Sequence, residues 1–198
     1  MSKYYHKDRN WLYEKWEVKT LILGTFNPEN GPEADYYYGR VRGRNYSNQF
    51  WPSLESYLNV INKDIQLKPV DIKAKIEIMQ KLKFYCRDLI KMVETINNDG
   101  NNTINNDFSD RLILKRNYKR QYYTNEIITE IKELGVKRVI TSWGKGTSIK
   151  LKEFQTELKN FQKECPEVEF KLYHLPPFGR PLMKRERLGK YIYEELLK

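Results

Sequence analysis

Three short apolar segments, rich in β-branched residues, constrain the fold of this chain more than any other feature. They are Thr20–Gly24, Val136–Trp143 and Val168–His174. Each has the length and composition of a buried strand. Between them, apolar residues recur at helical spacing, and we expect helices over Phe50–Leu58, Ile72–Thr95, Thr124–Leu134, Ile149–Phe161 and Leu188–Leu197.

Strands that alternate with helices form a largely parallel sheet, because each helix carries the chain back across the sheet. The sequence therefore predicts an α/β fold, a three-layer α/β/α sandwich with a central, mostly parallel four-stranded sheet. A length of 198 residues suits a single domain over residues 1–198. In such folds ligands bind outside the carboxyl ends of the strands.

The charge balance favours a polyanionic partner. Lys and Arg number 36 against 26 Asp and Glu, which gives a formal net charge of +10. Such a surplus attracts polyanions, most often nucleic acid, and the alternative is a soluble protein that is merely rich in lysine. The 15 tyrosines add flat faces with polar tips, which suit stacking on bases at a wet surface.

The cysteines and the apolar runs exclude several classes of protein. Cys86 and Cys165 are the only cysteines and no His cluster accompanies them, so we expect no iron–sulfur cluster, no zinc and no other cofactor. No apolar run approaches ~18 residues, and the first residues are too polar for a signal peptide. We expect a cytoplasmic monomer with no membrane partner, nucleoid-associated in a prokaryotic cell.

A long loop of unusual composition follows the first strand. Asn27 and Asn48 provide amides in it, and Phe26 and Tyr36–Tyr38 provide aromatic faces. Enzymes that act on a base in DNA extrude it into a pocket that reads its polar edge and sandwiches its ring. Such a pocket needs an amide, an aromatic platform and backbone donors at a strand end.

Five motifs in this order resemble the uracil-DNA glycosylase superfamily. They are LILGTFNP, YYYG with NQFW, FYCRDLI, VITSWGKG and YHLPPFGRP, and they span Thr20 to Pro181. The resemblance is nearest to the mismatch-specific uracil/thymine and hypoxanthine DNA glycosylase branches. Those branches open with a strand ending in Gly-x-Asn-Pro or Gly-Ser-Phe-Pro and close with a Leu-Pro-Ser-type loop. The resemblance implies a monofunctional DNA N-glycosylase, a hydrolase of DNA repair.

The chain departs from this pattern in three places. The segment from Gly24 to Pro28 is one residue longer than either family version, so which family residue Asn27 replaces stays open. In the closing loop, Pro177 stands where the family has Ser. The segment between the tyrosines and Asn48 is also longer, and it adds Arg40, Arg42 and Arg44.

The resemblance implies a role for each matching residue. Asn27 would position the hydrolytic water, and Asn48 is the alternative essential amide. His174 would stabilise the departing base anion, although Leu175 separates it from the proline that follows directly in classical uracil glycosylases. Because an amide is no strong base, either assignment implies slow chemistry driven by positioning and electrostatics. A structural role is the alternative for all three. For each Asn it is a side chain that bonds its own backbone turn, and for His174 it is a satisfied residue at a strand end. The residues that would contact the base are Gly24, Thr25, Phe26, Tyr37 and Tyr38.

Basic and proline-rich segments would contact the DNA. The three added arginines, and Lys145 after the second predicted strand, would neutralise phosphates. A stiff tip would enter the minor groove as a wedge; it consists of Pro176, Pro177, Phe178, Gly179 and Arg180. Two further basic runs are candidates for phosphate contacts, namely Lys115, Arg116, Lys119 and Arg120, and Lys184, Arg185 and Arg187.

We therefore expect a protein that flips uracil, hypoxanthine or thymine out of double-stranded DNA and hydrolyses its N-glycosidic bond, leaving an abasic site. No recognisable Schiff-base lysine accompanies the motifs, which favours simple hydrolysis. The alternative is a non-catalytic, basic nucleic-acid-binding protein of the same fold. Pro176–Phe178 is also similar to a motif of DNA amino-methyltransferases, but Leu175 cannot hold an exocyclic amine, so this third interpretation is weaker.

Overall fold

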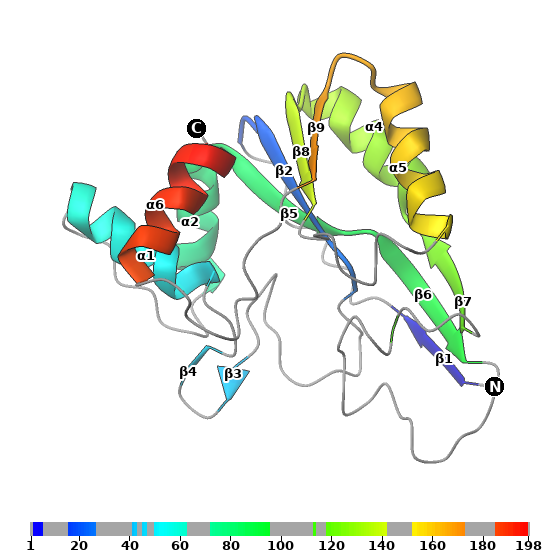
Figure 1. Ribbon diagram of the computed structural model, residues 1–198, viewed down its shortest axis with the longest axis horizontal. Coiled ribbons are helices and arrows are strands. Elements are labelled where there is room, and N and C mark those ends of the chain that lie inside the picture. Colours follow the sequence, from blue (N-terminus) through cyan, green and yellow to red (C-terminus); the bar gives the residue numbers. More distant parts are fainter. Residues whose placement is uncertain are drawn as a thin grey trace.

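A four-stranded parallel sheet lies at the centre of the computed structural model, which describes residues 2–5, 16–26, 41–42, 45–46, 50–62, 72–95, 113, 118–141, 152–172 and 185–197. Its strands are β2 (Thr20–Gly24), β5 (Phe84–Asp88), β8 (Arg138–Thr141) and β9 (Glu169–Leu172). They lie in the order β5-β2-β8-β9, and each neighbouring pair is parallel (Figure 1). The predicted α/β fold with a central parallel sheet is confirmed.

Helices cover both faces of this sheet (Figure 1). On one face, α4 (Thr124–Leu134) and α5 (Lys152–Glu164) pack over Leu21, Leu23 and Val139. These sheet residues are fully buried. The core between the sheet and this helix layer therefore consists mainly of aliphatic residues that alternate along the strands.

The opposite face of the sheet packs against a second layer of helices. Ile22, Cys86 and Ile140 of the sheet meet Trp51 and Leu188 there. The helices of this layer are α1 (Phe50–Asn62), α2 (Ile72–Leu82) and α6 (Arg185–Tyr191), which continues as the π-helical segment η1 (Ile192–Leu197). The two helix layers and the sheet are the three layers that the sequence predicts.

The strand β5 runs on into a second, antiparallel sheet. Only Leu89 separates it from β6 (Ile90–Thr95), which lies between β1 (Ser2–Tyr5) and β7 (Tyr118–Tyr122). A separate antiparallel pair consists of β3 (Val41–Arg42) and β4 (Asn45–Tyr46). Neither of these sheets was predicted from the sequence.

The predicted helix over Ile72–Thr95 is wrong beyond Leu82. Lys83 takes a left-handed conformation with φ 56°, which ends α2, and the chain enters β5 at the next residue. The residues of β5 and β6 are largely buried on both faces. Their apolar side chains therefore continue the helical spacing of α2 by coincidence, and spacing alone does not distinguish a buried strand from a buried helix.

The other predicted elements are present, two with the predicted bounds and the rest with shifted ends. The strand Thr20–Gly24 and the helix Thr124–Leu134 have the predicted bounds. The helix predicted to start at Phe50 does so, and it continues to Asn62. Strands β8 and β9 begin after their predicted starts, and α5 begins later than predicted, at Lys152.

The helices α1 and α6 approach so closely that only glycine fits at their contact. A Cβ atom on Gly189 would lie 1.8 Å from the backbone O of Ser53 and 2.7 Å from Cβ of Tyr57. The contact continues along η1, where the hydroxyl of Tyr57 donates a 3.1 Å hydrogen bond to Glu194. The close approach fixes α6 on the helix layer that covers β2 and β5.

We expect Gly189→Ala to lower the free energy of unfolding by about 3 kcal/mol, because the added methyl group meets backbone atoms that cannot rotate away. Gly135 provides the matched control, since it has φ +65° and nothing within 4 Å of an added Cβ. Gly135→Ala should cost only its left-handed strain, about 1 kcal/mol. Urea denaturation followed by circular dichroism measures both losses. If the two variants lose equal free energies of unfolding, α6 moves away from α1 more easily than the close contact implies.

Candidate functional site

The carboxyl ends of the parallel strands form the edge at which a sheet of this kind binds its ligands. In sheet order, the strands end at Asp88, Gly24, Thr141 and Leu172. From β2 the chain passes to β5 on one side and later to β8 on the other side. The strand order therefore reverses between β2 and β8, and this switch point is the usual position of a ligand site.

The first residues after β2 are held by the chain that follows β5. The N–H groups of Leu89 and Ile90 donate hydrogen bonds of 3.0 and 2.9 Å to the carbonyl oxygens of Gly24 and Thr25. Thr25 and Phe26 are buried, and Phe26 packs in the core under α4 and α5. The loop after β2 thus starts from a fixed backbone, while stacking of Phe26 on a base stays a prediction.

A row of aligned residues crosses the sheet just inside this edge. Leu23 pairs with Arg87 on one side and with Thr141 on the other. Aligned residues of parallel strands share a face, so all three lie on the face that α4 and α5 cover. Leu23 is fully buried, and the exposed fractions of Arg87 and Thr141 are only 9% and 1%. Two buried polar residues therefore flank an apolar one next to the switch point.

A buried network balances the charge of Arg87. Its guanidinium lies 3.2 Å from Oε1 of Glu130 on α4 and 4.5 Å from the ring centroid of Tyr123. Tyr85 donates a 2.8 Å hydrogen bond to the second carboxylate oxygen of Glu130. Buried charges persist in proteins when they are paired and hydrogen-bonded in this way. The network fixes β5 to α4, and within it Glu130 is the counter-ion of Arg87.

A second network removes Arg120 from the candidate DNA contacts. Its side chain has no exposed surface, and it donates two 3.0 Å hydrogen bonds to the carboxylate of Glu153 on α5. Tyr122 donates a 2.7 Å hydrogen bond to the same carboxylate. Hydrogen bonds from Arg120 hold the pKa of Glu153 below its usual value. The prediction that Arg120 belongs to a phosphate-binding run is therefore wrong, because its charge joins β7 to α5.

Neither cysteine is suited to act as a nucleophile. Burial raises the pKa of the Cys86 thiol well above its usual value, and the nearby carboxylate of Asp88 raises it further. Burial also raises the pKa of the Cys165 thiol. Both are free thiols that lie in cores on opposite faces of the sheet, so they cannot pair with each other.

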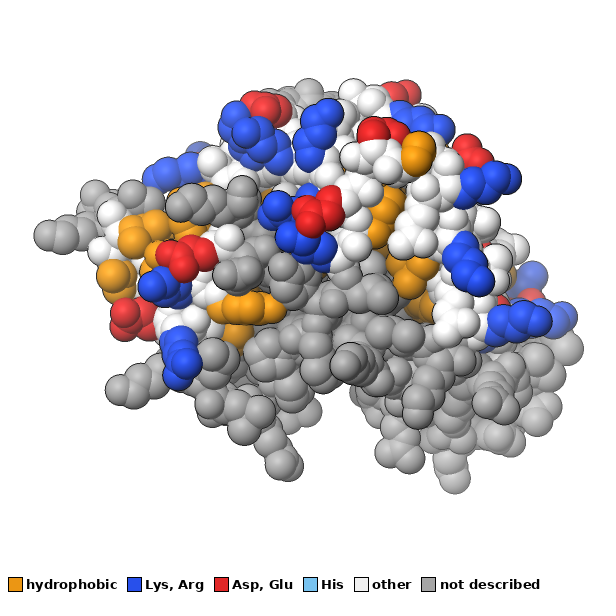
Figure 2. Space-filling view, turned by 45° about the horizontal axis from the view of Figure 1, so that its top comes forward, with side chains coloured by type: hydrophobic (Ala, Val, Ile, Leu, Met, Phe, Trp, Pro, Cys, Tyr) orange, Lys and Arg blue, Asp and Glu red, His pale blue; other side chains and the backbone are white. Residues whose placement is uncertain are grey.

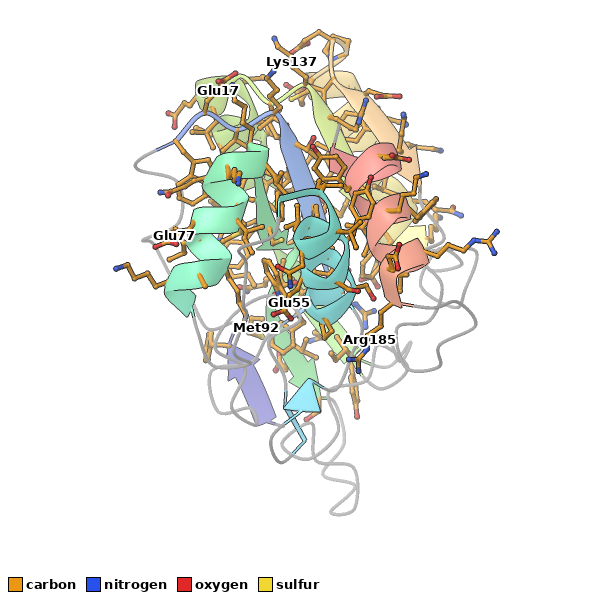
Figure 3. The ribbon with its side chains drawn as sticks, turned by 90° about the vertical axis from the view of Figure 1, so that its left-hand side faces the viewer. Glu17, Glu55, Glu77, Met92, Lys137 and Arg185 are labelled. Carbon is orange, nitrogen blue, oxygen red and sulfur yellow. The ribbon has the colours of Figure 1, made fainter. Side chains whose placement is uncertain are left out.

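On the face shown in Figure 2, the charged side chains of the described residues are spread out rather than gathered in one patch, and several basic ones have an acidic neighbour. At the amino end of the strands, Lys83 pairs with Glu17. Figure 3 places Glu17 at one end of the molecule and Met92 and Arg185 toward the other. Arg185, which belongs to one of the predicted basic runs, thus lies toward the end that carries the carboxyl edge of the sheet.

Most of the residues predicted for the site lie outside the described residues. The structure describes Gly24, Thr25 and Phe26, and for Arg42 it describes only the backbone in β3. The predicted residues outside the described ranges are Asn27, Asn48, His174, Tyr37, Tyr38, Arg40, Arg44, Lys145, Pro176, Pro177, Phe178, Gly179 and Arg180. Their roles stay predictions.

Three polar residues near the edge were missed from the sequence, namely Arg87, Glu130 and Thr141. Arg87 had no clear signal, because the segment FYCRD has three apolar residues followed by two charged ones and is largely buried on both faces. No local signal marks Glu130, since its partner lies on another element.

The described side chains offer no evident metal site. Within the described ranges, no three His, Cys, Asp or Glu side chains are grouped closely enough to hold a metal ion. None of the helices among these residues has both the length and the apolar character needed to span a membrane.

Comparison with protein-family models, with curated proteins and with solved structures finds no match to this chain. The fold and the residues at the carboxyl edge of the sheet are therefore the basis for inferring its function.

We expect Glu130→Gln to lower the free energy of unfolding by about 3–5 kcal/mol, because it leaves the charge of Arg87 buried without its counter-ion. The double variant Arg87→Met/Glu130→Leu, which removes both charges, should recover most of this loss. Urea denaturation of the wild type, Arg87→Met, Glu130→Leu and the double variant gives the coupling energy. Wild-type stability in Glu130→Gln would contradict the assigned ion pair.

Glu153 should make the folded protein sensitive to acid. Its folded-state pKa lies below the ordinary value of 4.5, so its stabilising contribution is present above pH 4.5 and is lost as the pH falls through the depressed pKa. In Glu153→Gln, the Tm should therefore fall less steeply below pH 4.5 than in the wild type. Glu133→Gln, at an exposed position on α4, is the control for removing a carboxylate outside this network.

Proposed function

We propose that this protein is a DNA N-glycosylase of the uracil-DNA glycosylase type, which hydrolyses the N-glycosidic bond of uracil, hypoxanthine or mismatched thymine in DNA. The position of three strand ends is the observation that carries this proposal. The strands β2, β8 and β9 are neighbours and end at one edge of the sheet. The motifs TFNP, SWGKG and YHLPPFGRP directly follow these three ends in the sequence. The ends of β2 and β8 flank the switch point, where sheets of this kind build their ligand sites, and the end of β9 lies beside them.

The fixed start of the first motif supports this proposal. Catalysis by amide side chains depends on holding water and substrate in the reacting geometry, because an amide adds little as a base. The hydrogen bonds from Leu89 and Ile90 fix Gly24 and Thr25. These residues immediately precede the segment that contains Asn27, so a site built there begins on rigid backbone.

The proposed reaction uses water and no cofactor. The bond between the anomeric carbon and the base nitrogen breaks, and its electron pair leaves with the base. The oxygen of water bonds to the anomeric carbon, and a proton from that water neutralises the base anion. In this proposal Asn27 or Asn48 orients the water or the base, and His174 donates a hydrogen bond to the anionic base.

The charge of the chain supports DNA as the partner. The formal net charge is +10, and Lys119, Arg185 and Arg187 are exposed members of the predicted basic runs. Cations that neutralise phosphates release counter-ions from the DNA, so affinity should fall steeply as salt is added. Double-stranded DNA that holds a deaminated or mismatched base is the proposed substrate.

The second candidate function is nucleic-acid binding without catalysis on the same fold. The altered motifs favour it, because the first motif carries an extra residue before Pro28 and Pro177 replaces the serine of the closing loop. Both candidates predict binding that weakens with salt. They differ in whether a base is released.

We expect the purified protein to release at least one base from duplexes that contain uracil, hypoxanthine or a guanine–thymine mismatch. Alkali-labile abasic sites measure this release. Either Asn27→Ala or Asn48→Ala should slow it about a hundredfold, because a misplaced water or base loses the reacting geometry. Asn160→Ala, at an exposed position toward the carboxyl-terminal end of α5, is the matched control and should react at the wild-type rate.

The opposite result is also informative. Absence of base release from all three duplexes, together with DNA binding that weakens as salt is added, would favour the second candidate over the glycosylase.

A further inference from the structure

A hydroxyl group without a described partner is buried at the switch point. Thr141 is the last residue of β8, and 1% of its surface is exposed. In the part of the chain that the structure describes, its Oγ1 has no hydrogen-bond partner. A buried hydroxyl without a partner destabilises the folded state, so native proteins keep few of them.

Other buried hydroxyls on the same side of the sheet do have partners. The hydroxyl of Tyr85 donates a 2.8 Å hydrogen bond to Glu130. The hydroxyl of Thr124 donates a hydrogen bond to Glu157. The fold therefore supplies acceptors for hydroxyls in this layer, and Thr141 differs from them by its place at a strand end.

Ser53 is the other buried hydroxyl without a partner among the described residues. It lies in α1, on the opposite side of the sheet, where α6 approaches its backbone. A Cβ on Gly189 would lie 1.8 Å from the backbone O of Ser53. A contact this close leaves no room between the two helices for a ligand. Ser53 therefore provides a control for Thr141, since it shares the unpaired hydroxyl and lacks the place at the sheet edge.

We propose that Oγ1 of Thr141 forms a hydrogen bond with the polar edge of the base that is held at the switch point. This inference rests on the proposed function and assigns to it a base-binding residue. A hydroxyl both donates and accepts hydrogen bonds. Uracil, thymine and hypoxanthine each present a carbonyl oxygen beside a ring N–H, so either group can pair with Oγ1. The free protein then holds an unpaired group that the bound base satisfies.

The neighbours of Thr141 favour a strong hydrogen bond there. Leu23, its aligned partner on β2, is fully buried. On the far side of Leu23, the charge of Arg87 is balanced by Glu130 at 3.2 Å. A hydrogen bond in such a low-dielectric place is stronger than one in water.

The test compares Thr141→Val with Thr141→Ser. Valine keeps the shape of threonine without the hydroxyl, whereas serine keeps the hydroxyl. Two quantities are measured: the Tm of the free protein, and its affinity for duplexes that carry uracil, hypoxanthine or mismatched thymine on a 2′-fluoro sugar, which resists hydrolysis. An undamaged duplex of the same sequence gives the reference affinity.

We expect Thr141→Val to have a Tm equal to or above that of the wild type, because it removes an unpaired buried hydroxyl. Its affinity for the duplex that the wild type prefers should fall about tenfold, with no change for the undamaged duplex. Thr141→Ser should keep the wild-type preference. Ser53→Ala should have a Tm equal to or above that of the wild type. It should also keep the full preference for the base-bearing duplex.

Two results would overturn this inference while the proposed function stands. One is a Tm below that of the wild type for Thr141→Val, because the hydroxyl would then have a partner inside the free protein. The other is an unchanged preference for the base-bearing duplex in Thr141→Val. A wild-type protein that shows no preference among the duplexes would overturn the proposed function together with this inference.

Discussion

The burial of β2 between two helix layers is the constraint on which the other elements depend. Leu21 and Leu23 pack toward α4 and α5, Ile22 packs toward α1 and α2, and all three are fully buried. A strand without an exposed face needs backbone partners on both edges, because water cannot satisfy its polar groups. β5 and β8 supply them. The loop after Gly24 therefore leaves the best-supported point of the sheet.

The fold class could be predicted because it depends on the number and order of the elements. β2 is a continuous apolar run that ends in Gly24, and α4 repeats isoleucine at helical spacing, so both had clear signals. β5 had none of comparable strength. It follows α2 after the single residue Lys83, and no Gly or Pro marks the boundary. A left-handed lysine ends the helix there, which composition does not reveal.

The candidate site could be predicted only in outline. Strand ends can be read from the sequence, and they indicate where loops gather. Which charges remain available to a ligand depends on pairs between distant elements, such as Arg120 with Glu153 and Arg87 with Glu130. Arg120 and Lys119 are adjacent in the sequence, yet Lys119 is exposed and Arg120 is bound inside the fold. Sequence alone does not show which of these two basic residues is exposed and which is buried.

The positions of the partner strands of β2 along the chain also set the order in which the sheet can form. Ile22 pairs with Cys86 on one edge and with Ile140 on the other, so both partners lie far along the chain. Pairing between such distant segments is slow, because the entropy of closing the loop is lost before the contacts form. During synthesis, β2 leaves the ribosome well before β8. Until β8 follows, one edge of an apolar strand is open to other chains, which makes Thr20–Gly24 an aggregation hazard of the nascent protein.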